Sequence, residues 1–282
     1  MHTSAVRSDS GQLSEAGGTL CSVTNDTALP RTLALTMGAV ATTAGIGAAA
    51  TVGYRRFRRM LAANAAELNE TLPINSLWWR THAKEKGDLL YVAIGDSAAQ
   101  GIGASAPNRG YVGILADHIR LATGKTVRVL NLSVSGATVE LAVRDQLPRL
   151  AKLQPDIVTV AIGANNIAQW DPAAFEAGIR EVYAALPPHA LVADLPSFHL
   201  PHNERKVQAA NRIVHAVAAE YNLTVVPLYA TTKREGLRSV LSQVANDMFH
   251  PNDRGYRVWA DAFLPELSAT VAQRFPQLAT AE

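Results

Sequence analysis

From residue 88 onward, the chain alternates short apolar runs with longer segments of helical periodicity. The run Ile157-Val-Thr-Val-Ala-Ile162 is apolar almost throughout, as strands are when both faces of their sheet are covered. Strand–helix–strand repetition predicts an α/β fold with a parallel sheet and right-handed crossovers. The predicted strands are 89–94, 127–132, 157–162, 190–195 and 223–228, and the predicted helices are 111–122, 138–152, 173–185, 203–221 and 255–273.

A serine follows the first apolar run directly, in Tyr91-Val-Ala-Ile-Gly-Asp-Ser-Ala-Ala-Gln-Gly101. Ligands bind at the carboxyl ends of the strands in open α/β sheets, so Ser97 lies where a substrate is expected. A serine hydroxyl becomes an effective nucleophile when a base lies within hydrogen-bond reach. His250 is the candidate base, and Asp247, three residues earlier, can orient its imidazole from the same turn. These residues predict acyl-transfer chemistry.

Four short motifs follow one another along the chain. They are Gly95-Asp96-Ser97 with Gly101, Asn131-Leu-Ser-Val-Ser-Gly136, Gly163-Ala-Asn165-Asn166 and Asp247-Met-Phe-His250-Pro-Asn. Together they resemble the four sequence blocks of the SGNH (GDSL-type) serine hydrolase family, over roughly residues 86–275. The chain departs from the family pattern at two positions, with Ala98 in place of leucine and Asn166 in place of aspartate.

The resemblance implies both a fold and a site. The fold would be a flavodoxin-like, three-layer α/β/α sandwich with five parallel strands. The catalytic triad would consist of Ser97, His250 and Asp247. The oxyanion hole would be formed by the backbone N–H groups of Ser97 and Gly136 and by the side-chain amide of Asn165, because a developing oxyanion needs fixed donors. The implied activity is hydrolysis of a small-molecule or lipid carboxylic ester, without a metal or organic cofactor.

Other functions remain as alternatives. The same site chemistry could transfer the acyl group to an alcohol, as in an acyltransferase, or the chain could be a membrane-tethered binding protein with an inactive site. Gly101-Ile-Gly103 faintly resembles a dinucleotide-binding loop, but no acidic residue ends the second predicted strand. Nucleic acid is not an expected partner, because the net charge is only +2 and no basic patch with interleaved aromatics occurs. The sequence leaves the oligomeric state open.

Several polar residues near the motifs compete for a functional role. Asp96 is interpreted as a turn cap beside the nucleophile. Ser133 and Ser135 flank the second motif and have weaker claims than Ser97. Asp194 ends a predicted strand, and its role is unassigned.

Metal binding and disulfide formation are not expected. His199 and His202 could form part of a metal site, but no carboxylate ligand is clearly placed with them, so a pocket or surface loop is the preferred interpretation. Cys21 is the only cysteine and therefore cannot form an intrachain disulfide.

The beginning of the chain differs in composition from the rest. Residues 1–31 are rich in Ser, Thr, Gly and Asp and are predicted to form a disordered tail. Residues 32–54 carry no charge and are long enough to cross a bilayer, which predicts a single transmembrane helix and membrane association. Their Ala, Gly and Thr content also fits a soluble helix or an export signal. Four arginines in 55–59 follow, so the positive-inside rule places the catalytic domain on the cytoplasmic side.

A bridge connects this segment to the catalytic domain. Pro73 and the polar residues after it should break the helix predicted there. Trp78 and Trp79 either lie at a membrane interface or substrate entrance, or pack against the first strand or helix, and packing is the preferred interpretation. The predicted boundaries are 55–87 for the linker and helical bridge, 88–275 for the hydrolase domain and 276–282 for a C-terminal tail.

Overall fold

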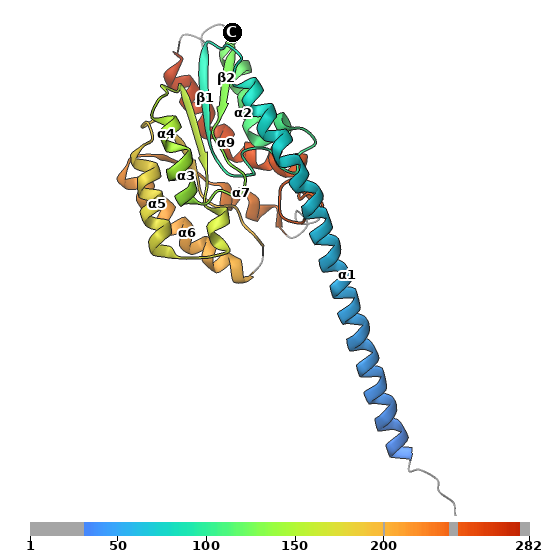
Figure 1. Cartoon of the computed structure of the whole chain (residues 1–282). Helices are drawn as coiled ribbons and strands as arrows, with labels where there is room; N and C mark the ends of the chain where they lie inside the picture. The colour runs from blue at the N-terminus through green and yellow to red at the C-terminus, as the bar shows by residue number, and fades with distance from the viewer. Residues whose placement is uncertain (1–30, 200, 237–241, 277–282) are drawn as a thin grey trace, which may run out of the picture. The chain divides into compact units, whose positions relative to one another are not determined.

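The computed structural model describes residues 31–199, 201–236 and 242–276, and Figure 1 shows their secondary structure. The chain divides into two compact units, residues 1–54 and residues 55–282. Apart from Arg31, the predicted disordered tail lies outside the described residues. The same holds for Cys21 and for all but the first residue of the predicted C-terminal tail.

Five parallel strands form one sheet in the second unit (Figure 1). They are β1 (Leu89–Gly95), β2 (Val127–Asn131), β3 (Ile157–Ala161), β4 (Leu191–Ala193) and β5 (Thr224–Val226). The strand order is β2-β1-β3-β4-β5, the flavodoxin-like order. In the register, Val92 of β1 pairs with Leu130 of β2 and with Val158 of β3. The predicted sheet is confirmed, although β4 and β5 are shorter than predicted.

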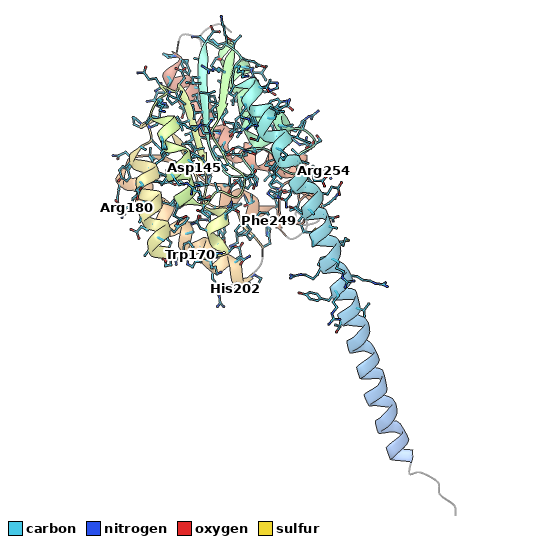
Figure 2. The ribbon with its side chains drawn as sticks, viewed as in Figure 1. Asp145, Trp170, Arg180, His202, Phe249 and Arg254 are labelled. Carbon is cyan, nitrogen blue, oxygen red and sulfur yellow. The ribbon has the colours of Figure 1, made fainter. Side chains whose placement is uncertain are left out.

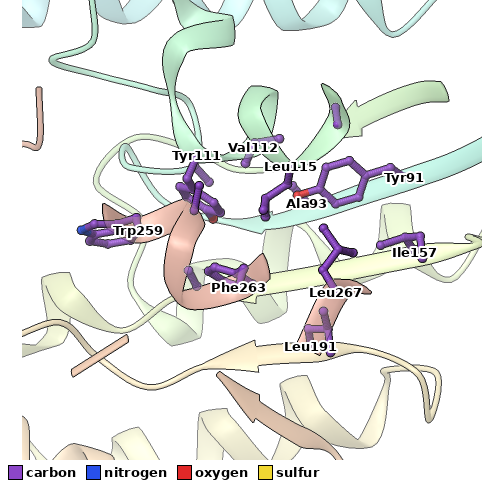
Figure 3. Packing of buried hydrophobic residues seen from close by; sticks show 14 of the residues in the cluster. Tyr91, Ala93, Tyr111, Val112, Leu115, Ile157, Leu191, Trp259, Phe263 and Leu267 are labelled. Carbon is purple, nitrogen blue, oxygen red and sulfur yellow. The ribbon is translucent and has the colours of Figure 1, made fainter. Parts of the chain in front are cut away.

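Helices cover both faces of the sheet. Successive side chains of a strand point to opposite faces, so each strand contributes to two cores. Tyr91 and Ala93 pack with helices α2 (Tyr111–Thr123) and α9 (Asp253–Arg274), as Figure 3 shows. Val92 and Ile94 pack on the other face with α3 (Val139–Asp145), α5 (Pro172–Ala184) and α6 (Pro201–Glu220). The predicted three-layer α/β/α sandwich is therefore confirmed.

The helix boundaries follow local chemistry. Helix α5 begins one residue before the predicted range 173–185, and Asp171 caps it, since Asp171 Oδ1 accepts the backbone N–H groups of Ala173 and Ala174 at 3.0 and 3.1 Å. The predicted helix over 138–152 is divided at Gln146 into α3 and α4 (Leu147–Leu150). Three short elements were not expected from the sequence: α7 (Leu228–Arg234) and the 3₁₀ helices η1 (Pro107–Arg109) and η2 (Ala164–Ile167).

Helix α1 (Arg31–His82) is continuous, with Pro73 inside it. The predicted break at Pro73 is therefore wrong. Asn75 Nδ2 and Trp79 Nε1 both donate to the carbonyl oxygen of Gln100, at 3.0 and 3.1 Å, and these buried contacts hold the helix beyond the proline. Trp79 is buried in the core beside α2, which confirms the packing interpretation for the tryptophan pair.

The predicted transmembrane segment, residues 32–54, is helical and forms part of α1. Within the described residues, no helix is both long and apolar enough to cross a bilayer. Alanine, glycine and threonine contribute less hydrophobicity than the leucine and isoleucine typical of such spans. The transmembrane prediction is therefore not supported.

Candidate active site

The chain turns sharply where β1 ends, and this turn presents Ser97. The N–H of Ile102 donates to the carbonyl oxygen of Ser97 at 3.1 Å, which closes the turn. A Cβ atom on Gly95 would lie 2.7 Å from the carbonyl oxygen of Ala161, so only glycine lets β1 approach β3 this closely. The nucleophile candidate is thus held at the carboxyl edge of the sheet.

A buried glutamine fixes the end of β1. Gln146 is fully buried, and its side-chain amide makes two hydrogen bonds to Gly95. Its Oε1 accepts the N–H of Gly95 at 3.1 Å, and its Nε2 donates to the carbonyl oxygen of the same residue at 2.8 Å. An amide can do both because it carries a donor and an acceptor. No sequence motif identifies Gln146 as important. Its place between α3 and α4 is visible only in the structure.

Ser97, His250 and Asp247 form a continuous hydrogen-bonded chain. Ser97 Oγ lies 2.8 Å from His250 Nε2, and His250 Nδ1 lies 2.6 Å from Asp247 Oδ2. Because an ionised carboxylate only accepts, Nδ1 carries the proton and Nε2 is left to accept the hydrogen of the serine hydroxyl. This is the arrangement that a serine nucleophile and its base require.

Asp247 is held by its own turn as well as by the imidazole. Its Oδ1 accepts the backbone N–H groups of Phe249 and His250, each at 3.0 Å. The turn passes through Met248 with φ at 59°, a left-handed conformation uncommon outside glycine. Burial raises the pKa of Asp247, but the hydrogen bonds from His250 and Phe249 lower it by more, so the pKa lies below the ordinary value for aspartate. The carboxylate therefore stays ionised at neutral pH.

A glycine after the nucleophile turn makes room for the histidine turn. Gly103 has φ at 91°, and a Cβ there would lie 2.5 Å from the carbonyl oxygen of Pro251 and 3.0 Å from Cβ of His250. Tyr256 OH also donates to the carbonyl oxygen of Ile102 at 2.6 Å. The glycines that faintly resemble a nucleotide loop therefore lie in the contact between the serine and histidine segments.

The two remaining oxyanion candidates lie next to each other. Asn165, in η2 after β3, donates from Nδ2 to the carbonyl oxygen of Ala137 at 2.9 Å, which ties it to the residue that follows Gly136. Gly136 has φ at 77°, and a Cβ there would meet nothing within 4 Å. The glycine is thus favoured for its left-handed backbone conformation and not because a side chain would lack space.

Asp96 caps the nucleophile turn, as the sequence indicates. Its Oδ1 accepts the N–H of Ala98 at 3.0 Å, and its Oδ2 lies 3.4 Å from the donor Asn165 Nδ2. Burial raises the pKa of Asp96 to about 6, against the opposing effects of the Ala98 N–H and the nearby His250. Asp96 is therefore a buried carboxyl that titrates close to neutrality.

We expect Asp96→Asn to flatten the dependence of unfolding free energy on pH. Because the folded-state pKa of Asp96 is raised, its contribution to stability is fully present below its ordinary pKa near 3.8 and is lost as pH rises through about 6. This difference corresponds to about 3 kcal/mol. Urea unfolding from pH 4 to pH 8 measures it, with the exposed Asp261→Asn as control. An unchanged slope in Asp96→Asn would contradict the assignment.

A cavity of about 180 Å³ opens onto Ser97 and His250. Its wall is largely apolar and includes Met248, Phe198 and Phe249. The rings of Phe198 and Phe249 are nearly parallel, with centroids 6.2 Å apart. Phe249, labelled in Figure 2, thus belongs both to the histidine turn and to the lining of the cavity.

The serines of the second motif have structural partners. Ser133 Oγ donates to Asn131 Oδ1, and Ser135 Oγ donates to Gln100 Oε1 at 3.1 Å. Neither hydroxyl is hydrogen-bonded to a histidine, so the preference for Ser97 holds.

The remaining polar candidates divide between the cavity and the fold. His199 lines the cavity, as the pocket-loop interpretation expects, whereas His202 is exposed on α6. Over the described ranges, no group of three or more His, Cys, Asp or Glu residues could hold a metal ion. Asp194 accepts from the N–H of Tyr229 at 2.7 Å and lies 3.1 Å from His215 Nε2, so it ties β4 to α6 and α7.

Comparison with known sequences identifies the family. The profile of the GDSL-like lipase/acylhydrolase family matches residues 93–258, more than half of the chain. The chain is 27% identical over 164 residues to esterase TesA of Pseudomonas aeruginosa, which covers 57% of this chain and 78% of that protein.

Comparison with solved structures supports the fold. LAE5, an α/β hydrolase enzyme from the metagenome of Lake Arreo, Spain, has a TM-score of 0.55 and 23% identity, covering 66% of this chain and 98% of that one. The crystal structure of TesA has a TM-score of 0.54 and 24% identity, covering 64% and 99%. A variant of Axe2, an acetyl xylan esterase from Geobacillus stearothermophilus, has a TM-score of 0.52 and 22% identity, covering 64% and 94%. The chain belongs to the GDSL-like lipase/acylhydrolase family of carboxylic ester hydrolases.

Proposed function

We propose that this chain hydrolyses carboxylic esters through an acyl-enzyme on Ser97. The observation that carries the proposal is the hydrogen-bonded chain from Ser97 Oγ through His250 to Asp247. Ser97 Oγ attacks the ester carbonyl carbon while His250 Nε2 takes the hydroxyl proton. That proton then leaves with the alcohol, and the serine is left acylated.

Water completes the cycle. His250 removes a proton from a water molecule that attacks the acyl carbonyl, and the same proton returns to Ser97 as the acid leaves. In both halves the imidazole becomes positively charged, and the ionised Asp247 stabilises that charge. The N–H groups of Ser97 and Gly136 would bind the oxyanion of each tetrahedral intermediate, together with the Asn165 amide hydrogen that otherwise makes the long 3.4 Å contact with Asp96 Oδ2.

We expect Asn165→Ala to lower kcat by about 10²–10³-fold, the usual cost of one lost oxyanion donor. KM should change much less, because the charge on the oxygen develops only in the transition state. Steady-state hydrolysis of a p-nitrophenyl ester measures both constants. The control is Asn203→Ala, which removes another amide from the cavity lining. A kcat equal to that of the wild type would exclude Asn165 from the oxyanion hole.

The cavity favours a short acyl group. Its volume of about 180 Å³ is below the roughly 300–1,000 Å³ typical of sites for drug-sized ligands. An apolar wall next to the nucleophile suits a hydrocarbon chain and offers little to a charged one. The names of two similar proteins, esterase TesA and the acetyl xylan esterase Axe2, agree with an acyl-ester substrate.

A fluorophosphonate probe tests the proposed function directly. The folded chain should be labelled at Ser97, and peptide mass spectrometry identifies the modified residue. Labelling should be prevented by heat denaturation and by preincubation with a short acyl ester. Labelling elsewhere, or none in protein whose fold is verified by circular dichroism, would refute the acyl-enzyme mechanism.

For the location of the catalytic domain, we propose the cytoplasmic side, on charge bias alone. Four arginines in 55–59 are exposed on α1, and positive charge that flanks a membrane-inserted segment is retained in the cytoplasm. A reporter fused to the C-terminus that is active only outside the cytoplasm should remain silent, and a strong signal would reverse the assignment.

A further inference from the structure

One wall of the cavity, residues 197–199, is hydrogen-bonded to a single carboxylate, that of Glu204. This carboxylate has no part in the proposed catalytic chemistry. Glu204 lies in the first turn of α6. Its Oε1 accepts the N–H of Phe198 at 2.6 Å and the N–H of His199 at 3.0 Å. The same oxygen accepts the hydroxyl of Ser197 at 2.9 Å. Three consecutive residues of the cavity lining, 197–199, are therefore bound by one oxygen atom.

The other oxygen of this carboxylate anchors it to the body of the domain. Tyr229 OH donates to Glu204 Oε2 at 2.8 Å, and the phenol in turn accepts from Lys233 Nζ at 3.0 Å. Burial raises the pKa of Glu204, but the hydrogen bonds from Tyr229 and Ser197 lower it by more, so the pKa lies below the ordinary value for glutamate. The carboxylate is thus charged and accepts from four donors at neutral pH.

The backbone conformation of residues 197–199 depends on hydrogen bonds from outside the segment. His199 has φ at 57°, a left-handed conformation that is uncommon outside glycine and carries an energetic cost. Phe198, immediately before it, lines the cavity and stacks beside Phe249 of the histidine turn, with ring centroids 6.2 Å apart. The hydrogen bonds to Glu204 therefore position the aromatic ring that stacks beside the histidine turn.

We propose that Glu204 is a positioning residue that holds the 197–199 wall and thereby sets the affinity for acyl groups longer than acetyl. This inference rests on the proposed ester hydrolysis at Ser97. An acetyl group fills only the space next to the nucleophile. The additional methylenes of a hexanoyl group would pack against Phe198, and each buried methylene contributes to binding.

The test compares p-nitrophenyl acetate with p-nitrophenyl hexanoate, using the full chain. In Glu204→Ala, the hexanoate-to-acetate ratio of kcat/KM should fall about tenfold, through KM. Glu204→Gln should recover much of this ratio, because its amide oxygen can still accept from the wall. Phe198→Ala should show the same change in ratio as Glu204→Ala. Glu181→Gln, on the exposed surface of α5, is the matched control and should leave the ratio unchanged.

Two results would overturn the proposal. If Glu204→Ala lowers both esters equally, the residue supports the fold alone. If the ratio stays constant or rises, the wall does not bind the longer chain. Hydrogen exchange of the peptide containing 197–199 gives a separate reading, and it should be faster in Glu204→Ala than in Glu181→Gln.

The proposal can also be judged without turnover. Dissociation constants for hexanoate and acetate, measured by NMR, give the same comparison in the Ser97→Ala background. If the wild type hydrolyses no ester, the proposed function fails. The Glu204 proposal then stands or falls on the hexanoate-to-acetate affinity ratio and on the exchange rates.

Discussion

Replacing Ser97 with alanine is expected to lower kcat for ester hydrolysis by about 10⁴–10⁶-fold, as in other triad enzymes that lose their nucleophile. The hydroxyl is the atom that would become acylated, and no other serine is hydrogen-bonded to His250 in the described part of the chain. Activity should therefore fall to the level supplied by substrate binding and the oxyanion donors alone. Hydrolysis of p-nitrophenyl acetate, followed over hours with excess enzyme, measures the residual rate.

The fold should tolerate this change, because among the described residues the Ser97 side chain is hydrogen-bonded to His250 alone. Thermal unfolding of Ser97→Ala should therefore stay close to that of the wild type. Ser135→Ala is the matched control, since this serine flanks the oxyanion loop and bonds Gln100; it should retain activity within a few-fold. A Ser97→Ala variant that keeps wild-type activity would place the nucleophile elsewhere.

Replacing Asp247 with asparagine is expected to lower kcat by about 10⁴-fold. Asp247 Oδ2 accepts from His250 Nδ1 at 2.6 Å, and that bond leaves His250 Nε2 free to accept the serine proton. An asparagine amide in this position would favour the opposite tautomer, with the proton on Nε2, so the histidine could no longer act as base. The pair of backbone hydrogen bonds to Oδ1 can persist, so the turn should remain folded.

A neighbouring carboxylate provides the control for Asp247. Asp253 accepts the N–H and the hydroxyl of Ser105, each at 2.7 Å, whereas the His250 ring is hydrogen-bonded to Asp247 and Ser97. Asp253→Asn should therefore cost far less activity than Asp247→Asn. Equal losses in the two variants, with thermal unfolding unchanged, would show that the carboxylate next to the histidine has no special role.

The sheet was predictable because its signal is local. A strand such as Ile157–Ala161 is a continuous apolar run bounded by polar residues, and five such runs at regular spacing specify the alternation. The prediction failed at Pro73, where the sequence pattern alone indicates a helix end. The hydrogen bonds from Asn75 and Trp79 to Gln100 are tertiary contacts, which no local pattern records.

The candidate site shows the same division. Ser97, His250 and Asp247 stand in recognisable motifs, so sequence could place them at one edge of the sheet. Gln146 and Glu204 lie in ordinary helical sequence, and their importance depends on what a folded chain brings next to them. Residues that react with substrate are thus found by motif, whereas residues that hold those groups in place are found only in three dimensions.

The proposed base, His250, and its carboxylate, Asp247, share one short turn, whereas the proposed nucleophile, Ser97, lies 153 residues earlier in the chain. Asp247 binds the backbone N–H and the imidazole of His250 at once, so the orientation of the ring is tied to the conformation of the turn. The proposed site is therefore assembled from two segments, and its one link between reacting groups is the hydrogen bond from Ser97 to His250. Gly103 lets these two segments pack closely, because it has no side chain between them. A larger residue at position 103 would push the segments apart. His250 would keep its hydrogen bond to Asp247 but would lie too far from Ser97 to remove the hydroxyl proton.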